Sequence, residues 1–572
     1  MSFEYLLLND KKTKKLSDDE QNNVINKIVD EFILYDKNRS ASLTKAKKLS
    51  DAVFFKNMSS PSKKDSWKAK VKMCKLFMFY QTLKAYIWKN VYSNAASMFD
   101  VSGENNTSDN DSNKQKAVLV DILEKMNYQK TCDEIIDNAL IYGELISFTA
   151  WKKKYQEYRR PINFFKNLFS SDFTKLPDIL NAITQGQNYW TDVRKIYDNP
   201  FIYSVNPQDL VFDVSQKNDW DNCPKIYRSF KTPSDIINNK LYKIDKQTAS
   251  EIYDLLSSDY KNYSDNFSVF DNSINDIVRG STIEVLEHWG NFTLPDGSIL
   301  NNWHAVIIGR KFLVKFSKNE RIINPFTFGT LIEDPDIKRG ISPLYSVLDL
   351  AALQENLTDR TLNLQALSEN PPLIAPEGFF EEDEISLYPG KIIEYSDNLS
   401  PQNAFQQLQF NPSIFLQDIS FLDELMCQVS GIFPNMTGAS DSASKTATEI
   451  NVKTQGQITR LSMIIDTINQ YLIIPNVQKI AELCANFKSG IETVSINKDN
   501  KKEFIEIDDN IRQGDYNYTY SDRSAFENRS SNADILLQAI DKFSSVLSLN
   551  LQEVFIWFFE QKGVDNPQRF LN

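Results

Sequence analysis

The sequence has few of the residues on which metal sites and nucleophilic catalysis depend. Only two histidines, His288 and His304, occur among 572 residues, and each stands beside a tryptophan. A His/Cys metal site needs several ligands close together, and neither histidine is accompanied by the motif of a catalytic nucleophile. We therefore predict structural roles for both histidines, no enzymatic activity, no metal and no cofactor.

Cysteine is also scarce. The five cysteines are odd in number and far apart in the sequence: Cys74, Cys132, Cys223, Cys427 and Cys484. This pattern predicts reduced, buried thiols in an intracellular protein. The first residues, Met1 to Leu8, lack the basic start and the long apolar core of a signal peptide. No run approaches the ~20 apolar residues of a membrane span, so no membrane partner is expected.

Positive charge is in deficit. The chain has 64 Lys and Arg against 76 Asp and Glu, a net charge of −12, and no basic domain. Tight, sequence-specific binding of nucleic acid needs clustered Lys and Arg, so this balance argues against it. A surface that lets DNA pass without holding it remains compatible with the charge.

A phosphate-binding loop is missing as well. The segment from Gly438 ends in Lys445-Thr446, as such loops do. The two glycines of the motif would fall at Ala439 and Ser444, however, so the chain cannot form the backbone nest that holds phosphates. An NTPase is therefore not expected.

The most informative stretch is Asn411–Phe487, which predicts a helix, a short polar loop and a longer helix. Asn411-Pro412 is a typical helix start and Gly431 a typical end. Thr446 to Glu449 has the spacing of a capping box, so a second helix is expected over 446–487. Pro475 lies inside it and predicts a kink, because its ring clashes with the carbonyl of Tyr471. An ordinary helical hairpin is the alternative interpretation.

The remaining patterns predict an α+β fold that is predominantly helical. Ser342-Pro343 predicts the start of a helix over 343–369, which Pro371-Pro372 ends. Short β-branched and aromatic runs between 201 and 316 predict a small antiparallel β region, with a hairpin turn at Asp296-Gly297. Helices are expected over 66–97 and, in two pieces, 117–142, with a loop over 103–114 between them. An amphipathic segment at 24–34 predicts a surface helix or arm.

Several of these segments, in this order, resemble those of bacteriophage portal proteins, particularly those of short-tailed phages. The matching segments include Tyr203 to Asp209, Glu284 to Trp289, Gly340 to Leu344, Ser444 to Glu449 and Asn566 to Leu571. The resemblance covers most of residues 65–572. The first ~60 residues have no counterpart in it, and the long C-terminal helical barrel of some members is missing.

The resemblance implies a division of the chain into regions. These are an N-terminal arm or helix (1–64), wing (65–340), first stem helix (341–369), clip (370–410), second stem helix (411–431), tunnel loop (432–445), long kinked helix returning to the wing (446–530) and crown (531–572). It also implies a ring at one capsid vertex, typically a dodecamer, through which double-stranded DNA is packaged and ejected.

The resemblance further implies partners and locations. The partners are the other copies in the ring, double-stranded DNA held without sequence preference, the major capsid protein or a scaffold, the terminase large subunit and a tail adaptor. The virion is the expected location, after assembly in the host cytoplasm. The clip residues expected to meet partners are Glu381, Glu382, Asp383, Glu384 and Tyr388. The acidic run 381–384 could also bind a cation, but a solvated charged surface is the favoured interpretation of its charge.

Two sets of residues are candidates for the channel. The tunnel-loop set offers hydrogen bonds and one weak phosphate contact, and consists of Asn435, Thr437, Ser440, Asp441, Ser442, Ser444 and Lys445. Channel-facing stem acids would repel the DNA backbone and let it slide. The candidates are Asp349, Asp359, Asp418 and Glu424, and a solvated or inter-subunit helix face is the alternative for each.

Two other functions remain as hypotheses. One is a scaffold that uses the helical stalk as an interaction platform and carries no DNA. The other is a hydrolase in the β region, which replacement of His288 and His304 by glutamine would test. No paired acid and base or metal constellation supports the hydrolase.

Overall fold

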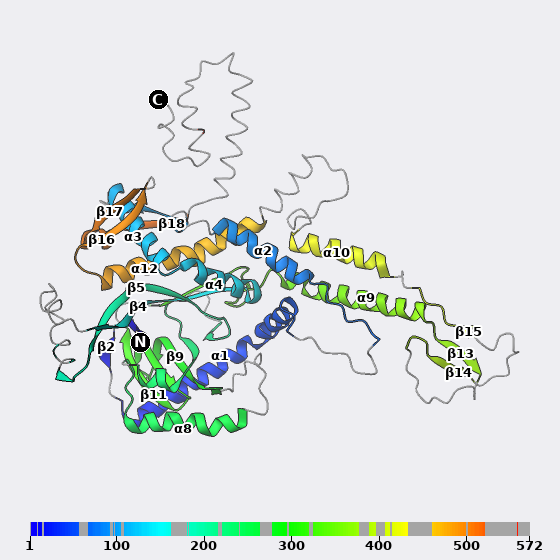
Figure 1. The fold of residues 1–572 in the computed structure, drawn as a ribbon, viewed down its shortest axis with the longest axis horizontal. Coiled ribbons are helices and arrows are strands. Elements are labelled where there is room, and N and C mark those ends of the chain that lie inside the picture. Colours follow the sequence, from blue (N-terminus) through cyan, green and yellow to red (C-terminus); the bar gives the residue numbers. More distant parts are fainter. Residues whose placement is uncertain are drawn as a thin grey trace, which may run out of the picture. The chain divides into compact units, whose positions relative to one another are not determined.

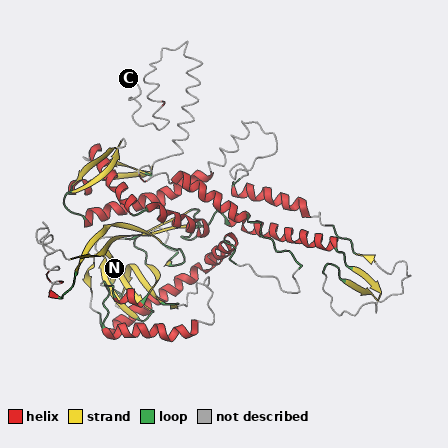
Figure 2. Cartoon of the chain, viewed as in Figure 1, coloured by secondary structure: helices red, strands yellow, loops and turns green. Residues whose placement is uncertain are grey.

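The protein is mixed α+β, as its computed structural model shows (Figures 1 and 2). The structure describes residues 2–7, 10–13, 16–56, 67–91, 95, 98–104, 108–161, 180, 182, 184–214, 220–239, 241–263, 277–294, 297–319, 324–376, 388–395, 406–411, 415–432, 460–498, 501–520 and 558. The chain divides into two compact units. Unit 1 is Met1–Tyr86 with Lys130–Gln457, and unit 2 is Ile87–Gln129 with Ile458–Asn572.

A seven-stranded antiparallel sheet forms the centre of unit 1, in the order β2-β11-β10-β9-β7-β6 with β8 paired to β9. Its strands are β2 (Asp10–Thr13), β6 (Leu210–Phe212), β7 (Lys225–Lys231), β8 (Val278–Arg279), β9 (Thr282–Thr293), β10 (Ile299–Ile308) and β11 (Phe312–Asn319). The predicted hairpin is confirmed, because β9 and β10 pair antiparallel and Gly297 at the turn has a φ of +81°.

Helices cover both faces of this sheet. They are α1 (Asp18–Val53) on one face and α7 (Pro233–Ile237) and α8 (Lys246–Tyr263) on the other. Neighbouring residues of β10 point to opposite faces, as strand geometry requires. Ile307 shares a core with Phe32 of α1, whereas Ile308 shares a core with Ile252 of α8.

The helix predicted around residues 24–34 is confirmed as part of α1, but it packs into this core, so the alternative of an arm is wrong. α1 begins with a capping box between Ser17 and Glu20 and is 36 residues long. Its residues Ile28 and Phe32 are buried against the sheet. β1 (Ser2–Leu7) and β2 also pair with strands far away in the sequence. The arm was expected because the strands that pair with this segment lie far along the chain and are not evident from its own sequence.

A second sheet in unit 1 is built on the long strand β4. β4 (Glu144–Pro161) pairs along its length with β5 (Tyr189–Ser204), and it also pairs with β1 and with β12 (Phe326–Thr330), all antiparallel. α4 (Tyr128–Tyr142) leads into β4. The predicted strand at 145–151 is therefore confirmed and continues for ten residues more.

The last part of unit 1 consists of two helices with a small sheet between them in the sequence (Figure 1). The chain runs along α9 (Tyr345–Glu369), forms β13 (Leu373–Pro376), β14 (Ile392–Tyr395) and β15 (Gln406–Gln407), and returns as α10 (Leu416–Ser430). β13 pairs parallel with β14 and antiparallel with β15. α10 ends at Gly431 with a φ of +73°, as predicted.

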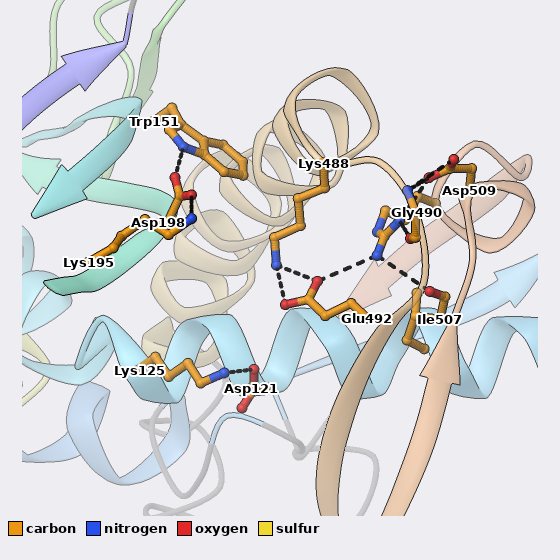
Figure 3. A network of polar contacts seen from close by, with 11 residues as sticks. Asp121, Lys125, Trp151, Lys195, Asp198, Lys488, Gly490, Glu492, Ile507 and Asp509 are labelled. Atoms are coloured by element: carbon orange, nitrogen blue, oxygen red, sulfur yellow. Dashed lines mark hydrogen bonds and ion pairs between the residues drawn. The ribbon is translucent and has the colours of Figure 1, made fainter. Parts of the chain in front are cut away.

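Unit 2 contains two small sheets and the helices between them. Its elements are β3 (Phe99–Gly103), α3 (Asp109–Lys125), η7 (Asn469–Ile473), α12 (Ile474–Phe487), β16 (Glu492–Lys498), β17 (Lys501–Ile507), α13 (Asp509–Arg512) and β18 (Tyr516–Tyr520). β16 pairs with β17, and β18 with β3. Buried Arg512 donates to the Gly490 carbonyl and to Asp509, and it lies 3.5 Å from Glu492, which also accepts from Lys488 (Figure 3).

The described part of the predicted helix 446–487 is helical from residue 460 to residue 487. The chain continues through Pro475 instead of stopping there. η7, a π-helical turn, precedes the proline and includes Tyr471, whose carbonyl would clash with the proline ring in a regular α-helix. The disturbance that Pro475 causes therefore takes the form of a π segment. Residues 446–459 lie outside the described residues.

Three predicted boundaries are wrong. The helix expected over 66–97 begins only at Lys75, as α2 (Lys75–Val91). The loop expected over 103–114 ends early, because Ser108 accepts a hydrogen bond from the N–H of Asp111 and caps α3. α9 begins at Tyr345, two residues after the predicted start, and Ser342 Oγ accepts from the N–H of Leu344 just before the helix while it donates to the carbonyl of Leu140.

Candidate functional site

The helical pair α9 and α10 contains the candidate acids and positions the small sheet. Leu422 and Met426 of α10 are buried on its inner side. Gln354 of α9 is 1% exposed and donates to the carbonyl of Ile419 (3.2 Å) and to Asp423 (3.3 Å). Because a buried amide needs partners, this pair of bonds fixes the register of the two helices.

An extended segment, residues 69–73, runs along α9, and we call it the strap. Three backbone N–H groups of the strap donate to side chains of α9: Ala69 to Asn363 Oδ1 (2.7 Å), Val71 to Asp359 Oδ1 (2.7 Å) and Met73 to Glu355 Oε1 (3.3 Å). Two residues of extended chain rise about 6.6 Å and four residues of helix about 6 Å, so the donors and acceptors stay in register. The strap thus binds to α9 through alternate N–H groups of extended backbone, in a segment for which the sequence predicted a helix.

Two lysines next to these bonds strengthen the attachment. Lys72 Nζ lies 2.7 Å from Glu355 Oε2, and Lys75 Nζ lies 2.8 Å from Asp423 Oδ1. Asp423 also accepts from Gln354. The start of α2, α9 and α10 therefore meet at one polar cluster. Glu355, Asn363 and Asp423 were not among the residues singled out from the sequence, because their partners are far away in the chain.

The four candidate stem acids differ in their surroundings. Asp349 on α9 and Asp418 and Glu424 on α10 are exposed. Asp359 is half-buried and accepts the N–H of Val71, so one of its carboxylate oxygens is already engaged. Whether any of the four faces a channel stays a prediction.

The same helices expose large apolar side chains. Phe421 is 64% exposed, Leu416 is 54% exposed and Leu353 is 47% exposed. Phe421 and Glu424 lie three residues apart, so both belong to one side of α10. This side therefore combines apolar and acidic side chains, which suits a contact with another protein chain better than a fully solvated surface.

The predicted clip residues are only partly described. Tyr388 is half-buried, and Lys391 Nζ lies 5.6 Å from the centre of its ring. Glu381, Glu382, Asp383 and Glu384 lie outside the described residues. So do all the tunnel-loop residues: Asn435, Thr437, Ser440, Asp441, Ser442, Ser444 and Lys445.

The start of α9 is anchored to β4 by a buried junction. Arg339 Nη1 donates to both oxygens of Glu144, at 2.8 and 3.0 Å, and both side chains are 4% exposed. Ser342 Oγ donates to the carbonyl of Leu140. Gly143 (φ +80°) and Gly340 touch through their backbones, and a Cβ at Gly340 would lie 2.1 Å from the Gly143 oxygen. The junction therefore fixes the point from which the helical pair leaves the sheet.

The two histidines lie within the seven-stranded sheet, 1% and 2% exposed. Burial lowers the pKa of His288 to about 3, so its ring stays neutral. His304 stacks on Trp289, with ring centroids 3.7 Å apart, and its Nε2 lies 3.5 Å from Glu287. Although burial by itself raises the pKa of the Glu287 carboxyl, Lys231 and His304 hold that pKa below its usual range. This environment supports structural roles for both histidines.

The structure also bears on metal sites and membrane spans. Among the described residues, no three His, Cys, Asp or Glu side chains are grouped so that they could hold a metal ion. No described helix combines the length and the apolar character needed to span a membrane.

All five cysteines are free, but only Cys132, Cys223 and Cys484 are buried. The expectation of five buried thiols is wrong for Cys74, which is exposed where the strap meets α2, and for half-buried Cys427.

Comparison with known families gives one finding. A family model described as phage SU10 portal protein matches residues 94–572 of the chain. The match includes α9, the small sheet and α10. No curated protein matches the chain.

Proposed function

The chain belongs to the phage portal protein family, and from this premise we propose that it forms a closed ring at one capsid vertex. The channel of the ring is the route by which double-stranded DNA enters and leaves the capsid. The ring is a dodecamer, it meets the major capsid protein or a scaffold around its rim, and it is assembled in the host cytoplasm. The terminase large subunit docks on it during packaging, and a tail adaptor docks afterwards.

The observation that carries this proposal is the helical pair with a small sheet between its helices, together with the family match over 94–572. In the proposal α9 and α10 are the stem and residues 370–410, with Tyr388, are the clip. Residues 432–445 are the tunnel loop, residues 446–530 return to the wing (65–340), and residues 531–572 are the crown. The junction of Glu144 with Arg339 then joins the stem to the wing.

The exposed apolar side chains of the stem support assembly into a ring. Phe421 and Leu416 are more than half exposed in the single chain. Burial of one such side chain contributes about 1.5–3 kcal/mol, and a ring repeats the contact at each interface. We assign Phe421 and Leu416 to the contact between neighbouring stems.

The charge of the chain supports passage of DNA without tight binding. A net charge of −12 per copy, repeated around a channel, repels the phosphate backbone. Exposed Asp349, Asp418 and Glu424 are the stem acids best placed to contribute. Asp359 contributes less because its carboxylate is engaged by the strap. The proposal includes no catalytic step and no cofactor.

Deletion of residues 434–445 tests the role of the tunnel loop. We expect the shortened chain to assemble into rings and procapsids, because the deletion leaves α9 and α10 intact, and to package less DNA per particle. Replacement of the acidic residues 381–384 by amides is a separate test of the clip: it is expected to weaken docking of the terminase or the adaptor, and its readout is that binding and not the DNA content. Normal DNA content in particles that contain the deletion would contradict the assignment of the loop.

A further inference from the structure

One part of unit 1 reverses the acidic character of the chain. The outer half of the β4–β5 hairpin, residues 152–161 and 189–198, contains seven Lys or Arg and three Asp or Glu, a net charge of +4. The cations are Lys152, Lys153, Lys154, Arg159, Arg160, Arg194 and Lys195. We call this part the basic ribbon. The net charge comes from residues 152–161, which contain five of the seven cations, because the cations and acids of residues 189–198 balance.

The cations of the basic ribbon lie on both of its faces. In the register of the hairpin, Tyr155 is opposite Lys195 and Arg159 is opposite Thr191, which puts Arg159 and Lys195 on one face. Arg160 and Arg194 belong to the other face. Gln156 is opposite Arg194, and Arg160 shares the face of Gln156 because the two are four residues apart on one strand. Arg159, Arg194 and Lys195 are exposed to solvent. Trp190 and Asp192 on the second face are buried, so a polyanion can approach the first face, that of Arg159 and Lys195, more freely.

Neighbouring side chains hold these cations in place. Arg160 Nε and Arg194 Nε lie 2.7 and 2.8 Å from the same oxygen of Asp192, which is 2% exposed. The Arg159 guanidinium lies 5.1 Å from the ring centre of Tyr189. Lys195 Nζ lies 2.6 Å from Asp198, which also accepts from the indole of Trp151 (Figure 3). Because two cations share one buried carboxylate at Asp192, positive charge remains in excess there.

The composition of the ribbon favours phosphate over a protein surface as the partner. The buried centres of protein interfaces are depleted in lysine, whereas four of the seven cations here are lysines. Lysine and arginine that contact phosphates are the common basis of binding without sequence preference. Exposed Val193 and Ile196 are the features that a protein partner would use instead.

We propose that the basic ribbon is a binding site for the phosphate backbone of double-stranded DNA, separate from the tunnel loop. It binds without sequence preference through Arg159 and Lys195, which lie on one face of the ribbon, and is weakened by salt. Because the rest of the chain is acidic, DNA is held at the ribbon and repelled elsewhere. This site does not depend on the ring, so its test is independent of the proposed channel.

The test compares two variants of the full chain that lose the same charge. The ribbon variant is Arg159→Gln with Lys195→Gln, which leaves the pairing of Arg160 and Arg194 with Asp192 intact. The control is Lys45→Gln with Lys48→Gln, two exposed lysines of α1. The measurement is binding of short fluorescent DNA duplexes of two unrelated sequences, by fluorescence anisotropy over a range of salt concentrations. Thermal unfolding and negative-stain microscopy of each variant verify its fold and assembly.

We expect the unsubstituted chain and the control to bind both duplexes equally well. The ribbon variant should bind each duplex about tenfold or more weakly at low salt, and the slope of log K against log salt should fall by about 0.9 for each lost phosphate contact. Equal affinity and slope in the ribbon variant and the control, with both folded, would overturn the proposal. So would a ribbon variant that retains DNA binding but loses binding to the capsid protein, because the ribbon would then be a protein contact.

Discussion

Removal of the Glu144 carboxylate should destabilise unit 1 strongly, because it leaves the charge of Arg339 buried without a counter-charge. Both side chains are 4% exposed, and Arg339 Nη1 donates to both carboxylate oxygens. Nε and Nη2 of Arg339 have no hydrogen-bond acceptor among the described residues. Breaking a buried ion pair from one side typically costs about 3–5 kcal/mol. We therefore expect Glu144→Leu to lower the free energy of unfolding by about that amount.

The loss of stability comes from the unpaired charge of Arg339. It should therefore largely disappear when both Glu144 and Arg339 are replaced. The double variant Glu144→Leu with Arg339→Met should recover most of the loss, because apolar residues of similar volume often replace a buried pair at little cost. The control is Glu251→Gln, which removes a pair with Lys311 whose side chains are 38% and 63% exposed. That change should cost less than about 1 kcal/mol.

The assay is thermal unfolding followed by tryptophan fluorescence of the unsubstituted chain, Glu144→Leu, the double variant and the control Glu251→Gln. A loss of about 3 kcal/mol corresponds to a shift of the unfolding midpoint by roughly 3–4 °C in unit 1, because the entropy of unfolding grows with the number of residues. Equal midpoints for Glu144→Leu and the double variant would refute the reasoning, because the loss would then come from packing and not from the unpaired arginine.

Two further predictions concern titration and the strap. The folded-state pKa of His288, about 3, lies below the value of a free histidine, so the unfolded chain binds the proton first and unfolding becomes easier as the pH falls from about 6.5 towards 3. The free energy of unfolding should decrease by about 1.4 kcal/mol per pH unit in that window, and His288→Gln should flatten the profile; an unchanged profile would contradict the neutral, buried state. Asp359→Ala should speed amide hydrogen exchange at Val71, because that N–H loses its acceptor, whereas Asp349→Ala on the same helix should leave it unchanged. Equal exchange in both variants would show that the strap is held by other contacts.

Much of the fold could be predicted because its signals are local. The hairpin of β9 and β10, the end of α10 at Gly431 and the end of α9 before Pro371 all follow from short sequence patterns. The pair of helices with a β-containing segment between them was also predicted from such patterns. The disturbance around Pro475 was predicted, but its form as a π turn was not, because the compensating geometry depends on how the helix packs.

The errors arise where distant parts of the chain meet. The strap was predicted to be helical because Trp67 and Val71 fit the helical spacing of the residues that follow, but Val71 donates to Asp359, 288 residues away. The N-terminal segment looks like a surface arm until its strands pair with β4 and β11. The basic ribbon differs, because five of its seven cations stand together in residues 152–160 and are visible in the sequence itself. The distant partners of the strap and of the N-terminal strands leave no local pattern in the sequence.

In the candidate site, too, the sequence indicates positions along a helix but not contacts with distant parts of the chain. The stem acids were chosen from helix position alone, and the structure distinguishes Asp359, which the strap engages, from exposed Asp349, Asp418 and Glu424. The acceptors Glu355 and Asn363 could not be chosen, because side chains that accept from a distant backbone resemble ordinary solvated polar residues. The tunnel-loop residues stay predictions.

The most direct test of the central claim is the size and shape of the purified full-length protein. Light scattering gives the mass of the particle, and negative-stain electron microscopy gives its outline. We predict a closed ring of many copies with a central hole wide enough for a DNA duplex, and its weakening when Phe421 is replaced by serine. Single chains at every concentration, and also in material released from virions, would contradict a portal ring.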